Sequence, residues 1–131
     1  MSVLVDTSAL YALLDRDDPR HAAAAEQLRE LRDPRSLVTH SYVLVETTAL
    51  LQRRAGVSAV RRLVDLTSPM GVIWVDETIH KAAMAALLAA PRRRVSLVDR
   101  VSFELMRDRG ISEAFAFDPD FVHEGFTTLP A

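Results

Sequence analysis

The sequence contains no cysteine, a single lysine (Lys81) and few aromatic residues, which make up 6% of the 131 positions. The absence of cysteine excludes disulfide bonds and thiolate chemistry. No stretch approaches the roughly 18 consecutive apolar residues of a transmembrane helix. The first residues also lack the basic region and long apolar run of a signal peptide. We therefore expect a cytoplasmic protein that does not enter a membrane.

The sequence also has no large excess of positive or negative charge. The sequence has 16 lysine and arginine residues against 18 acidic residues, a formal net charge of −2. No overall positive field therefore favours nucleic acid or membranes, although a local basic patch is sufficient to bind RNA. The remaining composition, 49% hydrophobic and 26% charged, is that of a soluble globular protein. The length predicts one domain over residues 1–131.

Short apolar runs alternate with helical segments along the chain. Strands are expected at residues 3–5, 36–40, 71–75 and 114–117, with a fifth candidate at 126–129. Helices are expected after caps at Ser8 and Ser41, and at 21–32, 57–67, 79–90 and 96–110. Strands separated by helices need crossover connections. The pattern therefore predicts a three-layer α/β fold, in which a small, mostly parallel sheet of four or five strands is flanked by helices.

Four acidic residues lie where this fold brings side chains to one edge of the sheet. Asp6 and Asp118 close the first and fourth strands, whereas Glu46 and Asp99 lie in early turns of helices. Ligands of parallel sheets bind at the carboxyl ends of the strands. We therefore expect these carboxylates to converge there, with Asp120 as a further candidate.

Each acidic residue taken alone also has a structural interpretation. Asp6 can cap the helix that follows it, and Asp99 fits a capping box with Ser96. The segment 118–120 has the composition of a turn. Glu46 is harder to explain in this way, because its neighbours on the same helix are apolar and an unpaired buried carboxylate is costly.

Carboxylates that converge repel one another. At about 5 Å and an effective dielectric constant of about 20, each pair costs roughly 3 kcal/mol. Few basic residues flank these positions in the sequence, so a bound cation is the natural compensation. Because the donors are all oxygen atoms, the cation is expected to be Mg²⁺ or Mn²⁺, as one or two ions. Such ions align a phosphodiester and activate water, which predicts phosphodiester hydrolysis.

The chain resembles a PIN domain over nearly its whole length. The resemblance rests on VLVDTSALYALLD, SYVLVETTALL, SLVDRVSFELMRDRGI and AFAFDPDFVHEGF, which occur in the order and spacing of the family. Within the family, the chain is similar to the VapC-type toxin ribonucleases of bacterial toxin–antitoxin pairs. The resemblance implies a metal-dependent endoribonuclease in which water, rather than a ribose hydroxyl, attacks the phosphorus. The products then carry a 5′-phosphate and a 3′-hydroxyl.

The resemblance also implies the roles of individual residues. By this resemblance, the catalytic, metal-binding carboxylates are Asp6, Glu46, Asp99 and Asp118. Supporting groups are the hydroxyls of Thr7, Ser96 and Ser102, with Asp120 at a position where family members vary.

Partners are inferred in part from the residues and in part from the resemblance. The run Arg92, Arg93 and Arg94, just before Asp99, is the preferred candidate for binding RNA phosphates, whereas the pairs 53–54 and 61–62 are expected to be solvated surface. We expect a structural role for His40 and a core position for Trp74. The resemblance implies a homodimer and a VapB-type antitoxin whose C-terminal segment lies across the toxin. Apolar positions in 9–14 and 43–51 form either the groove for that segment or buried core.

Two alternative interpretations do not involve RNA cleavage. A non-catalytic scaffold that binds RNA or a partner is disfavoured by the set of four carboxylates, which has no purpose in a scaffold. A Mg²⁺-dependent phosphoacceptor domain needs a lysine at the end of a late strand, whereas Lys81 lies in a predicted helix.

Overall fold

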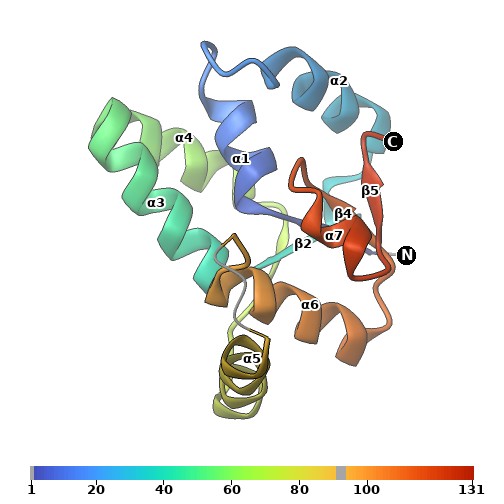
Figure 1. The fold of residues 1–131 in the computed structure, drawn as a ribbon. Helices are drawn as coiled ribbons and strands as arrows, with labels where there is room; N and C mark the ends of the chain where they lie inside the picture. The colour runs from blue at the N-terminus through green and yellow to red at the C-terminus, as the bar shows by residue number, and fades with distance from the viewer. Residues whose placement is uncertain (1, 91–93) are drawn as a thin grey trace.

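A five-stranded parallel sheet forms the centre of the molecule (Figure 1). The structure is a computed structural model that describes residues 2–90 and 94–131. The strand order is β3-β2-β1-β4-β5, and every neighbouring pair runs parallel. The strands are β1 (Val3–Val5), β2 (Leu37–His40), β3 (Gly71–Ile73), β4 (Glu113–Phe115) and β5 (Thr127–Leu129). The predicted parallel sheet is confirmed, and the fifth candidate strand is present.

Helices connect these strands and supply the crossovers that parallel pairing needs. They are α1 (Thr7–Leu14), α2 (His21–Leu31), α3 (Ser41–Ala55), α4 (Val57–Thr67), α5 (Glu77–Ala89), α6 (Leu97–Arg109) and α7 (Asp120–His123), with a 3₁₀ turn η1 (Pro34–Ser36). Among the residues that the structure describes, no helix is both long and apolar enough to cross a bilayer.

The sheet separates two apolar cores. Val3 and Val5 of β1 pack in a cluster with residues of α1, α2, α3 and α4. Leu4, which points to the opposite face, packs in a second cluster with residues of α6 and α7. A third cluster joins α5 to α6. Figure 1 shows the resulting three layers, with α1–α4 on one side of the sheet and α5 and α6 on the other.

Two helices begin earlier than the sequence predicted. The N-cap of α1 is Asp6 rather than Ser8, and the N-cap of α3 is His40 rather than Ser41. The reason is that the chain passes from strand to helix without a loop, so that the residue at the end of the strand serves as the cap. Both side chains accept hydrogen bonds from the first turn: Asp6 from the Ser8 N–H and His40 from the Val43 N–H.

The two serines are used elsewhere, and they explain why two strands are shorter than expected. The Phe117 N–H donates to Ser8 Oγ over 3.0 Å, so β4 ends at Phe115 and the chain turns towards α1. The Val75 N–H donates to Ser41 Oγ over 3.0 Å, beyond the end of β3 at Ile73. Asp118 therefore lies three residues past β4 rather than directly at its end.

One aromatic residue expected in the core lies on the surface. The Trp74 side chain is 75% exposed, and it follows β3 at the edge of the sheet. The sequence predicted a core position for it, as for most of the few aromatic residues. An edge strand, however, is covered on fewer sides than a central one.

Candidate active site

A cavity of about 390 Å³ lies at the carboxyl edge of the sheet, beside the start of α1. Its lining includes all four predicted carboxylates: Asp6, Glu46, Asp99 and Asp118. They come from the end of β1, from α3, from the first turn of α6 and from the loop after β4. The convergence expected from the strand ends therefore occurs in the structure.

Asp6 is held at the seam between β1 and α1. Its Oδ2 accepts hydrogen bonds from the Ser8 N–H at 3.2 Å and from the Ser8 hydroxyl at 2.7 Å. The side chain is 3% exposed, and burial raises the pKa of its carboxyl to about 6. The bonds from Ser8 oppose that rise in pKa, whereas the charge of Asp118 adds to it. Asp6 is thus both a helix cap and a group with a perturbed pKa, which is common at functional sites.

Asp99 combines its two possible roles in the same way. Its Oδ2 accepts a hydrogen bond from the Ser96 N–H at 2.9 Å, and its own N–H donates to Ser96 Oγ at 3.1 Å. This is a complete capping box at the start of α6. Burial raises the pKa of Asp99 to about 7, and the charges of Asp6 and Asp118 contribute to the rise. The capping box engages only one of the two carboxylate oxygens.

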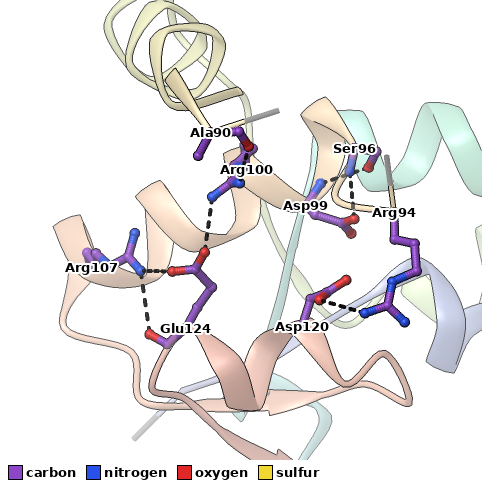
Figure 2. A network of polar contacts seen from close by, with 8 residues as sticks. All are labelled: Ala90, Arg94, Ser96, Asp99, Arg100, Arg107, Asp120 and Glu124. Carbon is purple, nitrogen blue, oxygen red and sulfur yellow. Dashed lines mark hydrogen bonds and ion pairs between the residues drawn. The ribbon is translucent and has the colours of Figure 1, made fainter. Parts of the chain in front are cut away.

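Asp118 and Asp120 form a linked pair at the start of α7. The Asp120 N–H donates to Asp118 Oδ1 at 2.9 Å. Burial raises the pKa of Asp118, and the charge of Asp120 raises it further. Asp120 is buried, and its Oδ1 lies 3.9 Å from a guanidinium nitrogen of Arg94 (Figure 2). Asp120 does not line the cavity, but it acts on Asp118.

Three of the carboxylates therefore influence one another through their charges. Burial is the main cause of their raised pKa values; the charge of Asp118 adds to the rise at Asp6, and the charges of Asp6 and Asp118 add to it at Asp99. Glu46 lines the same cavity from α3. Over residues 2–90 and 94–131, no three acidic or histidine side chains stand close enough together to chelate an ion as they are oriented. The structure thus places the four acidic groups in one cavity without bringing three of them to chelating distance.

The predicted supporting hydroxyls divide between the cavity and the core. Thr7 lines the cavity, and its buried Oγ1 has no hydrogen-bond partner among the described residues. Ser96 also lines the cavity, as the cap of α6. Ser102 lies elsewhere: it is fully buried, and its hydroxyl donates to the Val98 carbonyl at 3.2 Å.

Ser102 is part of a buried chain of hydrogen bonds that passes through His40. The Val43 N–H donates to His40 Nδ1 at 3.3 Å, so the ring proton lies on Nε2, which donates to Ser102 Oγ at 2.8 Å. Burial lowers the pKa of His40 to about 4, which keeps the ring neutral. The predicted structural role of His40 agrees with these contacts. They join α3, which carries Glu46, to α6, which carries Asp99.

Three arginines line the acidic cavity: Arg20, Arg54 and Arg94. Of the predicted triple-arginine run, Arg94 is described and Arg92 and Arg93 lie outside the described residues. Sequence reasoning did not single out Arg20, because no local pattern brings the start of α2 to the site. It treated the Arg53–Arg54 pair as solvated surface, whereas Arg54 lines the cavity.

Comparison with known proteins gives the class to which this fold and cavity belong. Residues 3–126 match the family described as PIN domain. The chain belongs to the PIN-domain family.

Within that family, the chain is a VapC-type ribonuclease. It is 35% identical over 129 residues to the 23S rRNA-specific endonuclease VapC20 of Mycobacterium tuberculosis, with 97% of each chain covered. It is also 40% identical over 72 residues to the ribonuclease VapC26 of the same organism, covering 55% of this chain and 50% of the relative.

Solved structures agree with this assignment. The crystal structure of M. tuberculosis VapC20, described as a sarcin–ricin loop cleaving toxin, matches with a TM-score of 0.87 over 96% of this chain and 97% of the other. PAE2754 from Pyrobaculum aerophilum matches with a TM-score of 0.71 at 18% identity, over 98% of this chain and 90% of the other. This second match supports the fold alone.

Proposed function

We propose that this ribonuclease depends on Mg²⁺ or Mn²⁺, bound as one or two ions by Asp6, Glu46, Asp99 and Asp118. The observation that carries the proposal is that these carboxylates share one buried cavity, in which the charge of Asp118 adds to the raised pKa of Asp6 and the charges of Asp6 and Asp118 add to that of Asp99. A protein gains nothing from such repulsion unless a cation or a proton compensates it. Here the cost of keeping the carboxylates together is explained by a cation that they share.

The groups in the cavity suit a hard divalent cation. The charged donors are carboxylate oxygens, which Mg²⁺ and Mn²⁺ prefer. The buried Thr7 Oγ1 adds a polar atom whose hydrogen-bonding capacity is unused among the described residues. When bound, such an ion lowers the pKa of water and offsets charge on the phosphate.

The side chains of this site serve to hold and orient. Ser8 fixes Oδ2 of Asp6, and the Ser96 N–H fixes Oδ2 of Asp99, so that each carboxylate turns its other oxygen away from its cap. Both serine hydroxyls are themselves engaged in cap hydrogen bonds. Water is the nucleophile in this proposal, as the family resemblance implies, and the RNA products carry a 5′-phosphate and a 3′-hydroxyl.

The proposed substrate is the sarcin–ricin loop of 23S rRNA. Support comes from the similarity to VapC20, which extends over 97% of both chains and includes the fold at a TM-score of 0.87. Because 97% of VapC20 is matched, VapC20 has no unmatched segment long enough to form a separate RNA-recognition domain.

The proposed protein partners are a VapB-type antitoxin and a second copy of the chain, in the cytoplasm. A cavity of about 840 Å³ is lined by Leu13, Leu14 and Leu51 together with charged residues of the loop after α1, of α3 and of α4. Of the apolar positions in 9–14 and 43–51, Ala9, Leu10, Ala12 and Val43 are buried core. The positions that line the cavity support a groove for an antitoxin segment. The homodimer is proposed from the family resemblance.

A cleavage assay on purified ribosomes and total RNA tests this proposal. Wild-type protein with Mn²⁺ is expected to cut 23S rRNA at the sarcin–ricin loop, and Asp6→Asn is expected to leave it intact. Asp108→Asn is the matched control, because Asp108 is an exposed carboxylate on α6. Cleavage by wild-type protein at other sites would refute the substrate. Metal-dependent RNA binding without cleavage would favour the scaffold alternative.

A further inference from the structure

We propose that Arg20 and Arg54 form a phosphate clamp, which binds backbone phosphates of the RNA next to the phosphodiester that is cut. This inference rests on the proposed function, because it assigns how the substrate is held over the same cavity. Both arginines line that cavity, one from the N-cap of α2 and the other from the last turn of α3.

The charge of the cavity creates the need for such a clamp. Its lining contains five carboxylates and three arginines: Asp6, Asp18, Glu46, Asp99 and Asp118 against Arg20, Arg54 and Arg94. The formal sum is −2 (three positive charges less five negative). RNA carries one negative charge per nucleotide, so the phosphates flanking the cut approach an acidic surface. Cations bound among the carboxylates act on the phosphate being cut, whereas its neighbours need positive charge of their own.

Aromatic rings hold both arginines in place. The Arg20 guanidinium carbon lies 5.5 Å from the centre of the Phe117 ring, and that of Arg54 lies 5.3 Å from the centre of the Tyr11 ring. Phe117 and Tyr11 pack against the apolar cluster of β1 and α1–α4. A guanidinium stacked in this way loses rotational freedom before RNA binds and keeps the N–H donors at its edge for a phosphate.

Other arginines near this end of the molecule are already committed to carboxylates. Arg100 and Arg107 bind Glu124 at 3.0 Å and 2.9 Å, and Arg94 faces Asp120 (Figure 2). Within residues 2–90 and 94–131, neither Arg20 nor Arg54 forms an ion pair with a carboxylate. The pKa of Arg54 is raised first by a hydrogen bond with the Tyr11 side chain and, less strongly, by the charge of Asp15, which lies outside ion-pair distance. These two arginines therefore combine a fixed position with available donors.

The position of Arg54 on α3 indicates which phosphate it reaches. Arg54 follows Glu46 by eight residues, which is about 12 Å along the helix axis at 1.5 Å per residue. Glu46 belongs to the group proposed to surround the phosphate being cut. Arg54 is therefore placed for a neighbouring phosphate, which makes it a positioning residue rather than a catalytic one.

The test measures the salt dependence of RNA binding. The probe is a fluorescein-labelled RNA hairpin of the sarcin–ricin loop, titrated in EDTA and separately in Ca²⁺ over a range of KCl concentrations. Arg20→Ala and Arg54→Ala are each expected to raise Kd several-fold. Each is also expected to lower the slope of log Kobs against log[KCl] by about 0.7, the value for one lost contact to single-stranded nucleic acid.

Three further variants separate the clamp from general positive charge. Arg53→Ala and Arg29→Ala remove exposed arginines of α3 and α2 that do not line the cavity, and both are expected to leave Kd and the slope unchanged. Arg54→Lys keeps the charge but loses the planar stacked group. It is expected to keep the slope while binding more weakly than wild type.

Cleavage in Mn²⁺ distinguishes failure of the clamp from failure of the proposed function. Arg54→Ala is expected to raise KM with little change in kcat. Unchanged binding and KM in both alanine variants, or equal losses in the controls, would refute the clamp while leaving a working ribonuclease. If the alanine variants lower the salt-dependence slope of RNA binding but wild-type protein never cuts RNA, the clamp is supported and the proposed ribonuclease mechanism is refuted. Loss of antitoxin binding with RNA binding intact would assign the arginines to the protein partner instead.

Discussion

Replacing Asp99 with asparagine is expected to stabilise the metal-free protein at alkaline pH. The side-chain amide oxygen can still accept the bond from the Ser96 N–H, so the capping box survives in part. What the substitution removes is a negative charge that burial, Asp6 and Asp118 all disfavour. The same change is expected to abolish cleavage, because a neutral amide binds a divalent cation poorly.

The size of the effect follows from the pKa of Asp99, which the folded protein raises from 3.8 to about 7. One pKa unit corresponds to about 1.4 kcal/mol, so ionising this carboxyl costs the folded state up to roughly 4 kcal/mol. The loss of a charge-assisted hydrogen bond at the cap offsets about 1 kcal/mol of the gain. We therefore expect Asp99→Asn to raise the free energy of unfolding at pH 8 by about 1–3 kcal/mol.

The contribution of Asp99 to the free energy of unfolding depends on pH. Because the folded state binds the Asp99 proton more tightly than the unfolded chain, the protonated carboxyl contributes stability below pH 4. That stability is lost as the pH rises through about 7. At pH 5, where Asp99 is protonated in the folded state, the variant is expected to gain little or nothing. His40 acts in the opposite direction: its pKa of about 4 means that stability present above pH 6.5 is lost on acidification.

Urea unfolding at pH 8 and pH 5, in EDTA and with Mg²⁺, measures these differences, with Asp108→Asn as the exposed control. Mg²⁺ is expected to stabilise wild type at pH 8 through binding to the folded state, and to stabilise the variant less. If Asp99→Asn instead destabilises the protein equally at both pH values, the carboxylate serves the helix cap alone. The argument from mutual repulsion would then be wrong.

Three further predictions concern other parts of the molecule. His40→Ala is expected to lower the free energy of unfolding in urea by about 2–4 kcal/mol, because it leaves a cavity and unpaired buried polar groups. Ser102→Ala is expected to lower it by only about 1 kcal/mol. Equal losses in the two variants would contradict the assigned hydrogen bonds. Glu46→Gln is expected to abolish cleavage and weaken Mn²⁺ binding by calorimetry while changing the free energy of unfolding by under about 0.5 kcal/mol. A fully active variant would remove Glu46 from the site. Gly56→Ala is expected to lower the free energy of unfolding by about 1–2 kcal/mol, because Gly56 joins α3 to α4 at a φ of +81°, which strains any residue with a Cβ. Steric overlap does not contribute, since nothing lies within 4 Å of an added Cβ. An unchanged melting temperature would contradict backbone strain at this position.

The sequence contains enough local information to place most of the candidate site. Asp6 lies directly after an apolar run, and Asp99 lies three residues after a helix-capping serine, so each position follows from a short pattern. Glu46 stands out because its helix is otherwise apolar. Once these elements are assigned to a parallel sheet, the carboxyl ends of its strands bring their side chains together.

Features that depend on contacts between distant residues were not predictable from the sequence. The hydrogen bond from His40 to Ser102 joins residues 62 positions apart, and neither residue lies in a sequence motif that predicts the contact. The stacking of Arg20 on Phe117 likewise joins the start of α2 to the loop after β4. Such pairs are set by the packing of layers, which hydrophobic periodicity alone does not specify.

The most direct test of the account maps the RNA ends that the purified protein produces, with Mg²⁺ or Mn²⁺ and with EDTA. If water attacks the RNA at a site where carboxylates bind a divalent cation, RNA is cut only when that cation is present. The new ends should be 5′-phosphates and 3′-hydroxyls, and Asp6→Asn should produce none. Cleavage that persists in EDTA, or that leaves 2′,3′-cyclic phosphates and 5′-hydroxyls, would contradict the account.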